Sequence, residues 1–285
     1  MNKEQEIIKE VQAVNKIIMR ELDRVCKKNN IRYYLDSGAL LGSIRHKGFI
    51  PWDDDVDVVF TRAEYNRLMK LPESEWGEAF ELYDYHDIEN NEVFDYVSRL
   101  LYKGVEIKHL MADKMGKNNK MAKYMGIDLF ILDNAFESVL RQKLLLAKLI
   151  VVYGFGLGHR PALDYSEYSA VQKPVIFILS RIGKLFSNQT IFGWYDKICQ
   201  SANKKTSSLY FVGNYPFTDL HRVMKKEWYA DVMPCQIDDE VWDGPIGRHE
   251  LLTTLYGDYM QLPPVEDRAG YHFVIVKKDN RERNK

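Results

Sequence analysis

The sequence has few cysteines and no excess of charge of either sign. Its three cysteines, Cys26, Cys199 and Cys235, are far apart, and none belongs to a Cys-x-x-Cys pair. This pattern argues against a disulfide framework and against a zinc knuckle. Lysine and arginine together number 40 and aspartate and glutamate 41, so the net charge is −1. Bulk nucleic-acid binding needs a strongly basic face, and we therefore expect no nucleic-acid partner.

The sequence also lacks a recognisable secretory signal and a convincing membrane-spanning segment. No charged start followed by an apolar stretch stands at the N-terminus, so we expect a cytoplasmic protein. The apolar run 143–158 is interrupted by Lys148 and is shorter than the roughly 20 residues that span a bilayer. Together with residues 174–186 it is expected to pack in the core. The alternative is a helix pair that docks on the inner face of a membrane.

Apolar periodicity predicts an α+β fold in one domain. Residues 3–29 repeat apolar side chains every three or four positions, which is typical of an amphipathic helix. Further helices are predicted at 39–45 and 62–71, and strands at 31–35, 56–60, 80–85, 93–101, 104–109 and 125–132. Because strands and helices do not alternate regularly, we expect a mixed β-sheet core with flanking helices over about residues 1–133. An added helical portion and a C-terminal segment would occupy about residues 134–285.

Four aspartates, Asp53, Asp54, Asp55 and Asp57, stand directly before an apolar run. Because strand side chains alternate between faces, Asp53, Asp55 and Asp57 would share one face, with Val56 pointing into the core. Like charges at one place raise the pKa of the carboxyl groups and destabilise the strand unless a cation neutralises them. Carboxylate oxygens suit Mg²⁺ or Mn²⁺. The cluster therefore predicts a divalent metal site, although acidic runs in general are more often solvated turns.

The segment before these aspartates predicts an anion-binding turn. Ser37 and Gly38 form a tight turn after the first predicted strand, and Gly42 lies in the short helix that follows. The start of a helix offers free backbone N–H groups, and glycine permits close approach of a phosphate. Arg45 and Lys47 come next, either to neutralise phosphate charge or to form surface salt bridges.

Asp128 is the one charged residue in the apolar run 127–132. A carboxylate in a central strand is costly unless it meets a cation. From the residues alone, that cation is either a metal ion or a nearby arginine or lysine. Asp133 at the end of the same run is expected to cap the next element.

The stretch around the acidic cluster resembles the LicD family, which includes bacterial phosphocholine transferases and the eukaryotic fukutin-related proteins. The resemblance lies in GALLG at 38–42 and in RHKGFIPWDDDVD at 45–57. Two later segments, GIDLFILD at 126–133 and LYGDYM at 255–260, fit the same family. The chain departs from the family at Ala39, where threonine is common, and at Ile131, where proline is common.

The resemblance implies a nucleotidyltransferase-like fold and metal-assisted phosphoryl transfer with Mg²⁺ or Mn²⁺. Its catalytic residues would be Asp55, Asp57 and Asp128, and the same three with Asp53 would be the metal ligands. Asp128 would either bind metal or deprotonate the acceptor hydroxyl. The substrate-binding residues would be Ser37, Gly38, Gly42, Arg45, Lys47 and Trp52.

By the same resemblance, the donor would be CDP-choline or a similar cytidine diphosphate conjugate. The acceptor would be a glycan hydroxyl of a teichoic acid precursor or lipopolysaccharide, in some cases lipid-linked, which would make peripheral membrane association useful. The same carboxylates would equally serve transfer of ribitol phosphate, glycerol phosphate or a nucleotide. A scaffold protein without catalysis is a further alternative, but the intact pair Asp55 and Asp57 argues against it.

Three further expectations concern single residues outside the cluster. Cys26 extends the apolar side of the first helix and is expected to be a buried thiol rather than a nucleophile. Gly257 is expected to end a helix, although its segment could instead close over the site. His272 either contacts phosphate or packs structurally.

Overall fold

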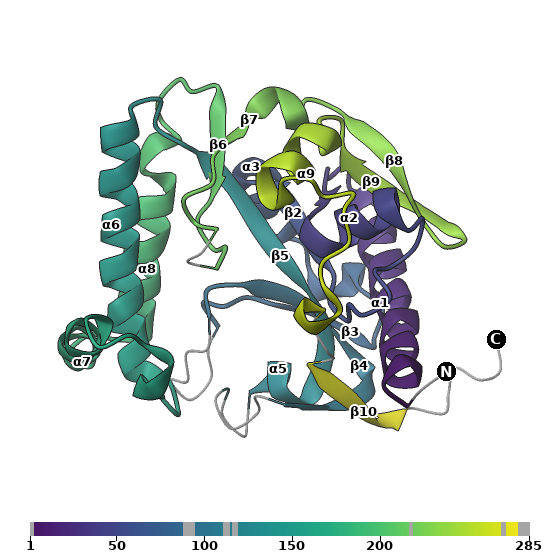
Figure 1. The fold of residues 1–285 in the computed structure, drawn as a ribbon, viewed down its shortest axis with the longest axis horizontal. Coiled ribbons are helices and arrows are strands. Elements are labelled where there is room, and N and C mark those ends of the chain that lie inside the picture. Colours follow the sequence, from purple (N-terminus) through teal and green to yellow (C-terminus); the bar gives the residue numbers. More distant parts are fainter. Residues whose placement is uncertain are drawn as a thin grey trace.

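The computed structural model describes residues 3–87, 95–110, 115, 119–216, 219–268 and 272–278. A curled mixed β-sheet forms its centre, and a helical lobe stands at one end (Figure 1). The strands are β1 (Tyr34–Leu35), β2 (Asp57–Thr61), β3 (Phe80–Tyr83), β4 (Ser98–His109), β5 (Tyr124–Asn134), β6 (Leu209–Val212), β7 (Met224–Lys225), β8 (Val232–Ile237), β9 (Glu240–Pro245) and β10 (Phe273–Lys278). The helices are α1 (Lys3–Lys28), α2 (Ser37–Arg45), α3 (Arg62–Leu68), α5 (Lys120–Lys123), α6 (Val139–Gly156), α7 (Gln172–Gly183), α8 (Asn188–Cys199) and α9 (Arg248–Tyr256). The predicted α+β class with a mixed sheet is confirmed.

The main sheet has eight strands and runs in the order β1-β2-β5-β4-β10. Strands β2 and β5 are parallel, whereas β1 pairs with β2 and β4 pairs with β5 in antiparallel fashion. β3 and β10 both pair with β4, and β6 and β7 continue from the end of β5. The strands predicted at 93–101 and 104–109 are one strand, β4, with a register shift between Tyr102 and Glu106; residues 93 and 94 lie outside the described part.

Helix α1 packs against the sheet through the apolar side that its periodicity predicts. Val11, Ile18 and Leu22 are fully buried on this side, as is Cys26. Burial also raises the pKa of the Cys26 thiol. The prediction of a buried, unreactive cysteine is therefore confirmed.

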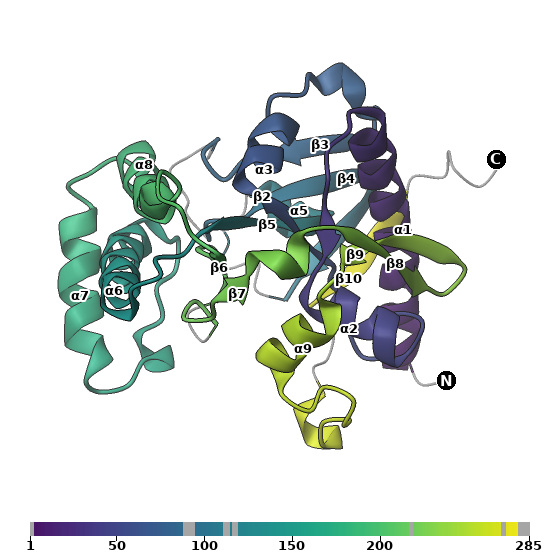
Figure 2. The same cartoon turned by 90° about the horizontal axis from the view of Figure 1, so that it is seen from above.

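The helical lobe consists of α6, α7 and α8 (Figure 2). A second core cluster, rich in aromatic residues, joins α6 and α8 to the segments around Tyr85, Tyr96 and Phe211. Tyr96 stacks on Tyr195 at a ring separation of 4.2 Å and meets Phe192 edge to face at 5.2 Å. Leu145 and Leu149 on the inner side of α6 belong to the same core. The apolar run at 143–158 is thus core on one side only, because the other side of α6 is exposed. Among the described helices, none combines the length and the apolar character needed to cross a bilayer.

Ion pairs join the lobe to the sheet. Arg62 of α3 lies 2.5 Å from Asp133 at the end of β5 and 3.2 Å from Asp196 of α8. His86 after β3 contacts Asp84 at 2.7 Å and Asp196 at 3.3 Å. The prediction that Asp133 caps the next element is wrong, because its carboxylate is buried and held by Arg62.

Candidate active site

Three charged side chains stand side by side on neighbouring strands. Asp57 of β2 is the register partner of Asp128 on β5, and Asp128 is the partner of Arg99 on β4. Residues paired in register project from the same face of a sheet. The Arg99 Nε lies 2.6 Å from the Asp128 Oδ1. We call these three side chains the charged row. A backbone hydrogen bond holds its Asp57 end, where the Asp36 N–H donates to the Asp57 carbonyl at 3.0 Å.

The acidic loop before β2 alternates in the way that the sequence predicts. Asp54 and Val56 are buried, whereas Asp53 and Asp57 are half-buried and Asp55 is exposed. The Asp54 carboxylate turns away from the other aspartates and accepts hydrogen bonds from His272, at 2.6 Å from its backbone N–H and 2.7 Å from its Nδ1. Asp53, Asp55 and Asp57 are left on the other side of the chain, next to Asp128.

The carboxylates repel one another strongly. Burial raises the pKa of Asp57 well above its usual range, and the charges of Asp55 and Asp128 raise it further. Burial and the neighbouring Asp55 raise the pKa of Asp53 to about 9. The pKa of Asp128 rises less, to about 6, because Arg99 opposes the effect of burial. In the described part of the chain, no lysine, arginine or histidine forms an ion pair with Asp53, Asp55 or Asp57.

This donor set fits a divalent cation in charge and in chemistry. A cation would remove the repulsion that raises these pKa values, and carboxylate oxygens are the ligands that Mg²⁺ and Mn²⁺ prefer. Among the described residues, no three acidic, histidine or cysteine side chains are already gathered in a metal-binding arrangement. Asp128 is in contact with Arg99, which is the alternative partner that the sequence left open for it. Asp53, Asp55 and Asp57 are therefore the better candidates for metal ligands.

Helix α1 also supports the acidic loop with two polar side chains. Gln12 Nε2 donates to the carbonyls of Ile50 and Asp53 at 3.0 and 2.8 Å. Asn15 is buried within the apolar side of α1 and donates to the Asp54 carbonyl at 2.9 Å. Helix α1, which the sequence predicted only as an amphipathic helix, therefore fixes the backbone that carries the aspartates.

The turn before α2 is built closely against the acidic loop. Ser37 has a positive φ of 44°, and a Cβ on Gly38 would lie 2.3 Å from the Asp53 Oδ2. Asp53 therefore occupies the space beside Gly38. Gly42 faces backbone instead, since its Cβ would lie 2.6 Å from the Gly48 carbonyl oxygen. The structure gives Gly42 a packing role between α2 and the following loop.

The predicted phosphate-binding cations have different surroundings. Arg45 Nη1 donates to the carbonyls of Tyr259 and Gln261 at 2.9 and 3.3 Å, so this guanidinium anchors the segment after α9. Lys47 is exposed on a turn with a positive φ of 54°. Arg268, by contrast, stacks on the Trp52 ring at 4.5 Å. The face of Trp52 thus already attracts a cation.

Asp36 is a residue near the site that the sequence did not reveal, and Tyr256 belongs to the segment for which closure over the site was the alternative to a helix end. Tyr256 is 46% exposed as a residue, yet its hydroxyl is enclosed beside Ser37. Burial raises the pKa of Tyr256, and the charges of Asp36, Asp57 and Asp53 raise it further. Asp36 is fully buried and accepts a hydrogen bond from the Tyr215 hydroxyl. Gly257, with φ of 67°, ends α9 as predicted, and the same helix end brings Tyr256 to the aspartates.

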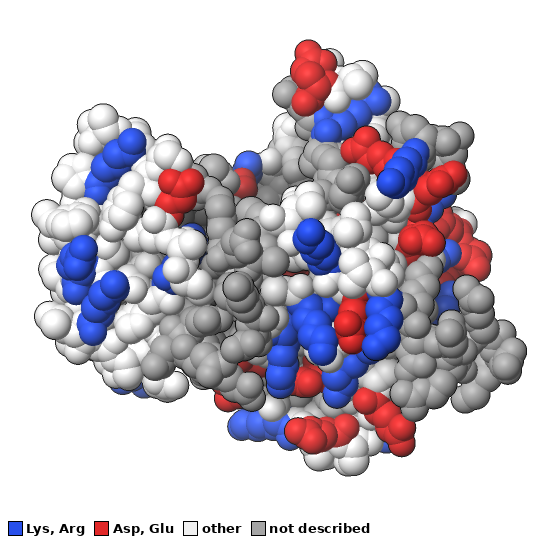
Figure 3. All heavy atoms as spheres, turned by 90° about the horizontal axis from the view of Figure 1, so that it is seen from below, with Lys and Arg blue, Asp and Glu red and all other residues white. Residues whose placement is uncertain are grey.

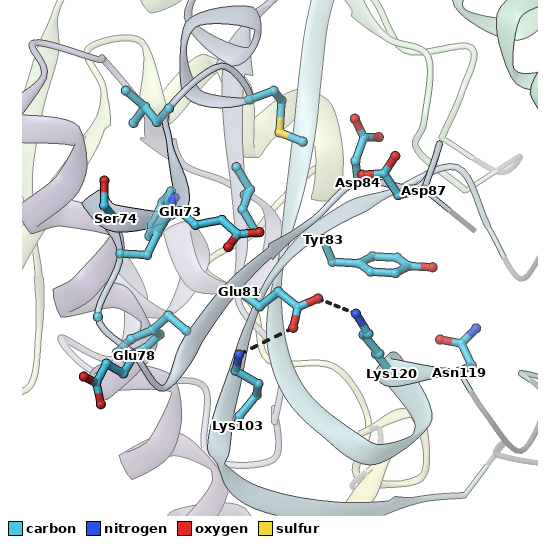
Figure 4. A pocket seen from close by; sticks show the side chains of 16 residues that line it. Glu73, Ser74, Glu78, Glu81, Tyr83, Asp84, Asp87, Lys103, Asn119 and Lys120 are labelled. Atoms are coloured by element: carbon cyan, nitrogen blue, oxygen red, sulfur yellow. Dashed lines mark hydrogen bonds and ion pairs between the residues drawn. The ribbon is translucent and has the colours of Figure 1, made fainter. Parts of the chain in front are cut away.

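An open cavity of about 800 Å³ lies beside β3 (Figure 4). Glu81 stands between two lysines in this cavity, at 2.6 Å from Lys120 and 3.6 Å from Lys103. The other charged side chains of its lining are acidic: Glu73, Glu78, Asp84 and Asp87. Tyr83 links the cavity to the aspartates, because it is the register partner of Arg99.

Comparison with known proteins places these residues in a wider context. Residues 30–130 match the family described as LicD/FKTN/FKRP, nucleotidyltransferase domain, and this range contains every aspartate of the charged row. The chain is 29% identical over 271 residues to the lipopolysaccharide cholinephosphotransferase LicD of Haemophilus influenzae, with 93% of this chain and 96% of that protein covered. Shorter matches reach two uncharacterized Rickettsia proteins, at 39% identity over 54 residues in R. prowazekii and 49% over 41 residues in R. typhi. These two cover 19% and 14% of this chain and 20% and 13% of the relatives.

Proposed function

The chain carries a nucleotidyltransferase domain of the LicD/FKTN/FKRP family and is a LicD-type transferase, and from this premise we propose that it transfers phosphocholine from CDP-choline to a glycan hydroxyl. The acceptor would be a cell-surface glycan precursor, either teichoic acid or lipopolysaccharide. The observation that supports the proposal most is the charged row of Asp57, Asp128 and Arg99 within the matched range. The similarity to a lipopolysaccharide cholinephosphotransferase along nearly the whole chain supports this choice of donor and acceptor.

In this proposal, Asp53, Asp55 and Asp57 would hold Mg²⁺, which would neutralise charge on the diphosphate of the donor. Asp128 would act as the general base for the acceptor hydroxyl. Arg99 fixes this carboxylate at 2.6 Å, and its pKa of about 6 makes it a stronger base than an ordinary aspartate. Asp128 would take the proton of the acceptor hydroxyl while the oxygen attacks the phosphorus that bears choline. The bond from that phosphorus to the bridging oxygen breaks, and cytidine monophosphate leaves.

The acidic cavity beside β3 is the proposed approach for the acceptor. Asp128, Arg99 and Tyr83 lie on consecutive strands, so the cavity begins about 10 Å from Asp128 at the usual strand spacing. An excess of carboxylates repels the phosphates of a nucleotide but can hydrogen-bond the hydroxyls of a sugar. The lining therefore favours the uncharged part of a glycan over the donor.

The test is to incubate the purified protein with CDP-choline, CDP-ribitol, CDP-glycerol or nucleoside triphosphates, with and without Mg²⁺. We expect Mg²⁺-dependent thermal stabilisation by CDP-choline and slow release of cytidine monophosphate. Asp55→Asn should lose both effects. Asp239→Asn, the same change at an exposed carboxylate paired with Lys16, is the control and should keep them. Preference for another conjugate would overturn the choice of donor, and no Mg²⁺-dependent binding of any nucleotide would overturn the transferase assignment.

A further inference from the structure

The helical lobe exposes one apolar side of each of two helices. Eleven of the nineteen exposed large apolar side chains in the described part of the chain lie between residues 139 and 185. On and beside α7 they follow one another at intervals of three and four, with 38–81% of each residue exposed: Val171, Val175, Ile178, Ile182 and Leu185. On α6 the same spacing joins Leu140, Leu144, Ala147 and Val151. Residues so spaced share one side of a helix, and we call these two sets the lobe stripes.

The lobe stripes are not needed to hold the lobe together. Helix α6 already packs through its opposite side, where Leu145 and Leu149 are buried. Helix α7 approaches the end of α6 so closely that a Cβ on Gly183 would lie 2.0 Å from the Phe155 carbonyl oxygen. Both helices thus have a packed side and a second apolar side that faces solvent. Such a surface is typical of an interaction site.

The charged residues within the two helices that carry the lobe stripes all have one sign. Helices α6 and α7 contain no aspartate or glutamate, and their charged residues are Arg141, Lys143, Lys148, Lys173 and Arg181. By helical spacing, Lys143 and Lys148 flank the stripe of α6 on opposite sides. The net charge of the whole chain is −1, so this positive charge is a local feature. Figure 3 shows lysine and arginine side chains set into the largely uncharged surface of the lobe.

We propose that the lobe stripes dock in the plane of an anionic lipid bilayer. Apolar side chains would enter the boundary between headgroups and acyl chains, and the lysine and arginine side chains would stay at the level of the lipid phosphates. A second copy of this chain is a poor occupant, because two faces with the same positive charge repel each other. The docking does not depend on which donor the active site accepts, so its test is separate from that of the proposed transfer.

Flotation of the full chain with lipid vesicles tests the docking. Vesicles of phosphatidylcholine alone are compared with vesicles that also contain phosphatidylglycerol, at low and high salt. We expect binding to the anionic vesicles only, and weaker binding at high salt because surface charge is screened. The double variant Leu144→Glu/Ile178→Glu should lower vesicle affinity at least tenfold. Val241→Glu is the matched control, because Val241 is 55% exposed on β9 outside the lobe.

A second set of variants tests the contribution of charge. Lys143→Gln and Lys148→Gln should each lower the affinity for anionic vesicles about fivefold, which corresponds to one basic side chain near an anionic surface. Lys108→Gln, an exposed lysine of β4, should leave it unchanged. Circular dichroism checks that every variant is folded. The proposal is overturned if the folded wild type does not float with anionic vesicles, or if the Leu144→Glu/Ile178→Glu variant floats equally well. A dimer in light scattering that this double variant abolishes would also overturn it, because a second copy would then cover the stripes.

Discussion

Arg99 on β4 and Asp128 on β5 are direct register partners, and their side chains meet at 2.6 Å. Arg99 supplies the positive partner that the Asp128 carboxylate needs in a central strand. The same guanidinium also contacts Asp95 at 2.7 Å, so it serves two carboxylates. The contact with Arg99 therefore orients the Asp128 carboxylate beside Asp57.

Removing this arginine should destabilise the fold. In Arg99→Met, Asp128 loses its positive partner, and the free energy of unfolding should fall by about 3 kcal/mol. This is the lower end of the usual range, because 29% of the Asp128 side chain is exposed. Urea denaturation measures the loss, and Arg99→Met/Asp128→Leu should recover part of it because no unpaired carboxylate remains in β5. An equal loss in the single and the double variant would show that the ion pair does not matter.

Two neighbouring aspartates should respond oppositely to the same substitution. Asp57→Asn removes a carboxyl group whose pKa is raised by burial and by the charge of Asp55. At pH 7 the variant should therefore be at least as stable as the wild type. It should also lose all stabilisation by Mg²⁺ and all turnover. Asp54→Asn removes a buried acceptor for His272 and should lower the free energy of unfolding by about 2 kcal/mol. Thermal melting with and without Mg²⁺ checks both, and equal destabilisation of the two would contradict the proposed site.

The aspartates could be found from the sequence because alternation along an extended chain is a local property. The side chains of Asp53, Asp55 and Asp57 diverge from those of Asp54 and Val56 wherever the backbone is extended. The apolar side of α1 could be predicted for the same reason, since helical periodicity needs no information from the rest of the fold. Predictions of this kind depend only on neighbours in the chain.

The partners of these residues could not be found in this way. Arg99 meets Asp128 only because β4 and β5 pair in one particular register, and His272 reaches Asp54 across most of the chain. Arg99 was a usable signal, because an arginine directly before the apolar residues Leu100 and Leu101 needs a carboxylate just as Asp128 needs a cation. Asn15 gave a weaker signal, as one polar residue on an apolar helix side.

Two glycines of α2 should differ in what their substitution damages. In Gly38→Ala the new methyl group meets the Asp53 carboxylate, a side chain that can rotate away, so the fold should survive and Mg²⁺ affinity should fall about tenfold. In Gly42→Ala the methyl group meets the Gly48 backbone, and the free energy of unfolding should fall by about 2 kcal/mol. Calorimetric titration with Mg²⁺ and urea denaturation separate the two effects. A Gly38→Ala variant with unchanged Mg²⁺ affinity would remove Asp53 from the metal site.

The contact between the sheet and the helical lobe should depend on pH through His86. Burial alone would lower the pKa of this imidazole, but its hydrogen bonds to Asp196 and Asp84 outweigh burial and raise the pKa to about 9. The folded protein thus holds the proton more tightly than the unfolded chain, in which histidine titrates near about pH 6.5. The charged ring stabilises the fold fully below about pH 6.5, and this contribution is lost as the pH rises through 9.

Comparison of the wild type with His86→Gln at pH 6, 7.5 and 9.5 measures this contribution. The wild type should be more stable by about 1 kcal/mol at pH 6, a modest value because a third of the side chain is exposed to solvent screening. The difference in the free energy of unfolding should shrink at pH 7.5 and nearly vanish at pH 9.5. Because His86 bridges β3 and α8, the fluorescence of Trp194 in α8 should report the same transition. A difference that stays constant or grows with pH would mean that the imidazole is not charged between the two aspartates.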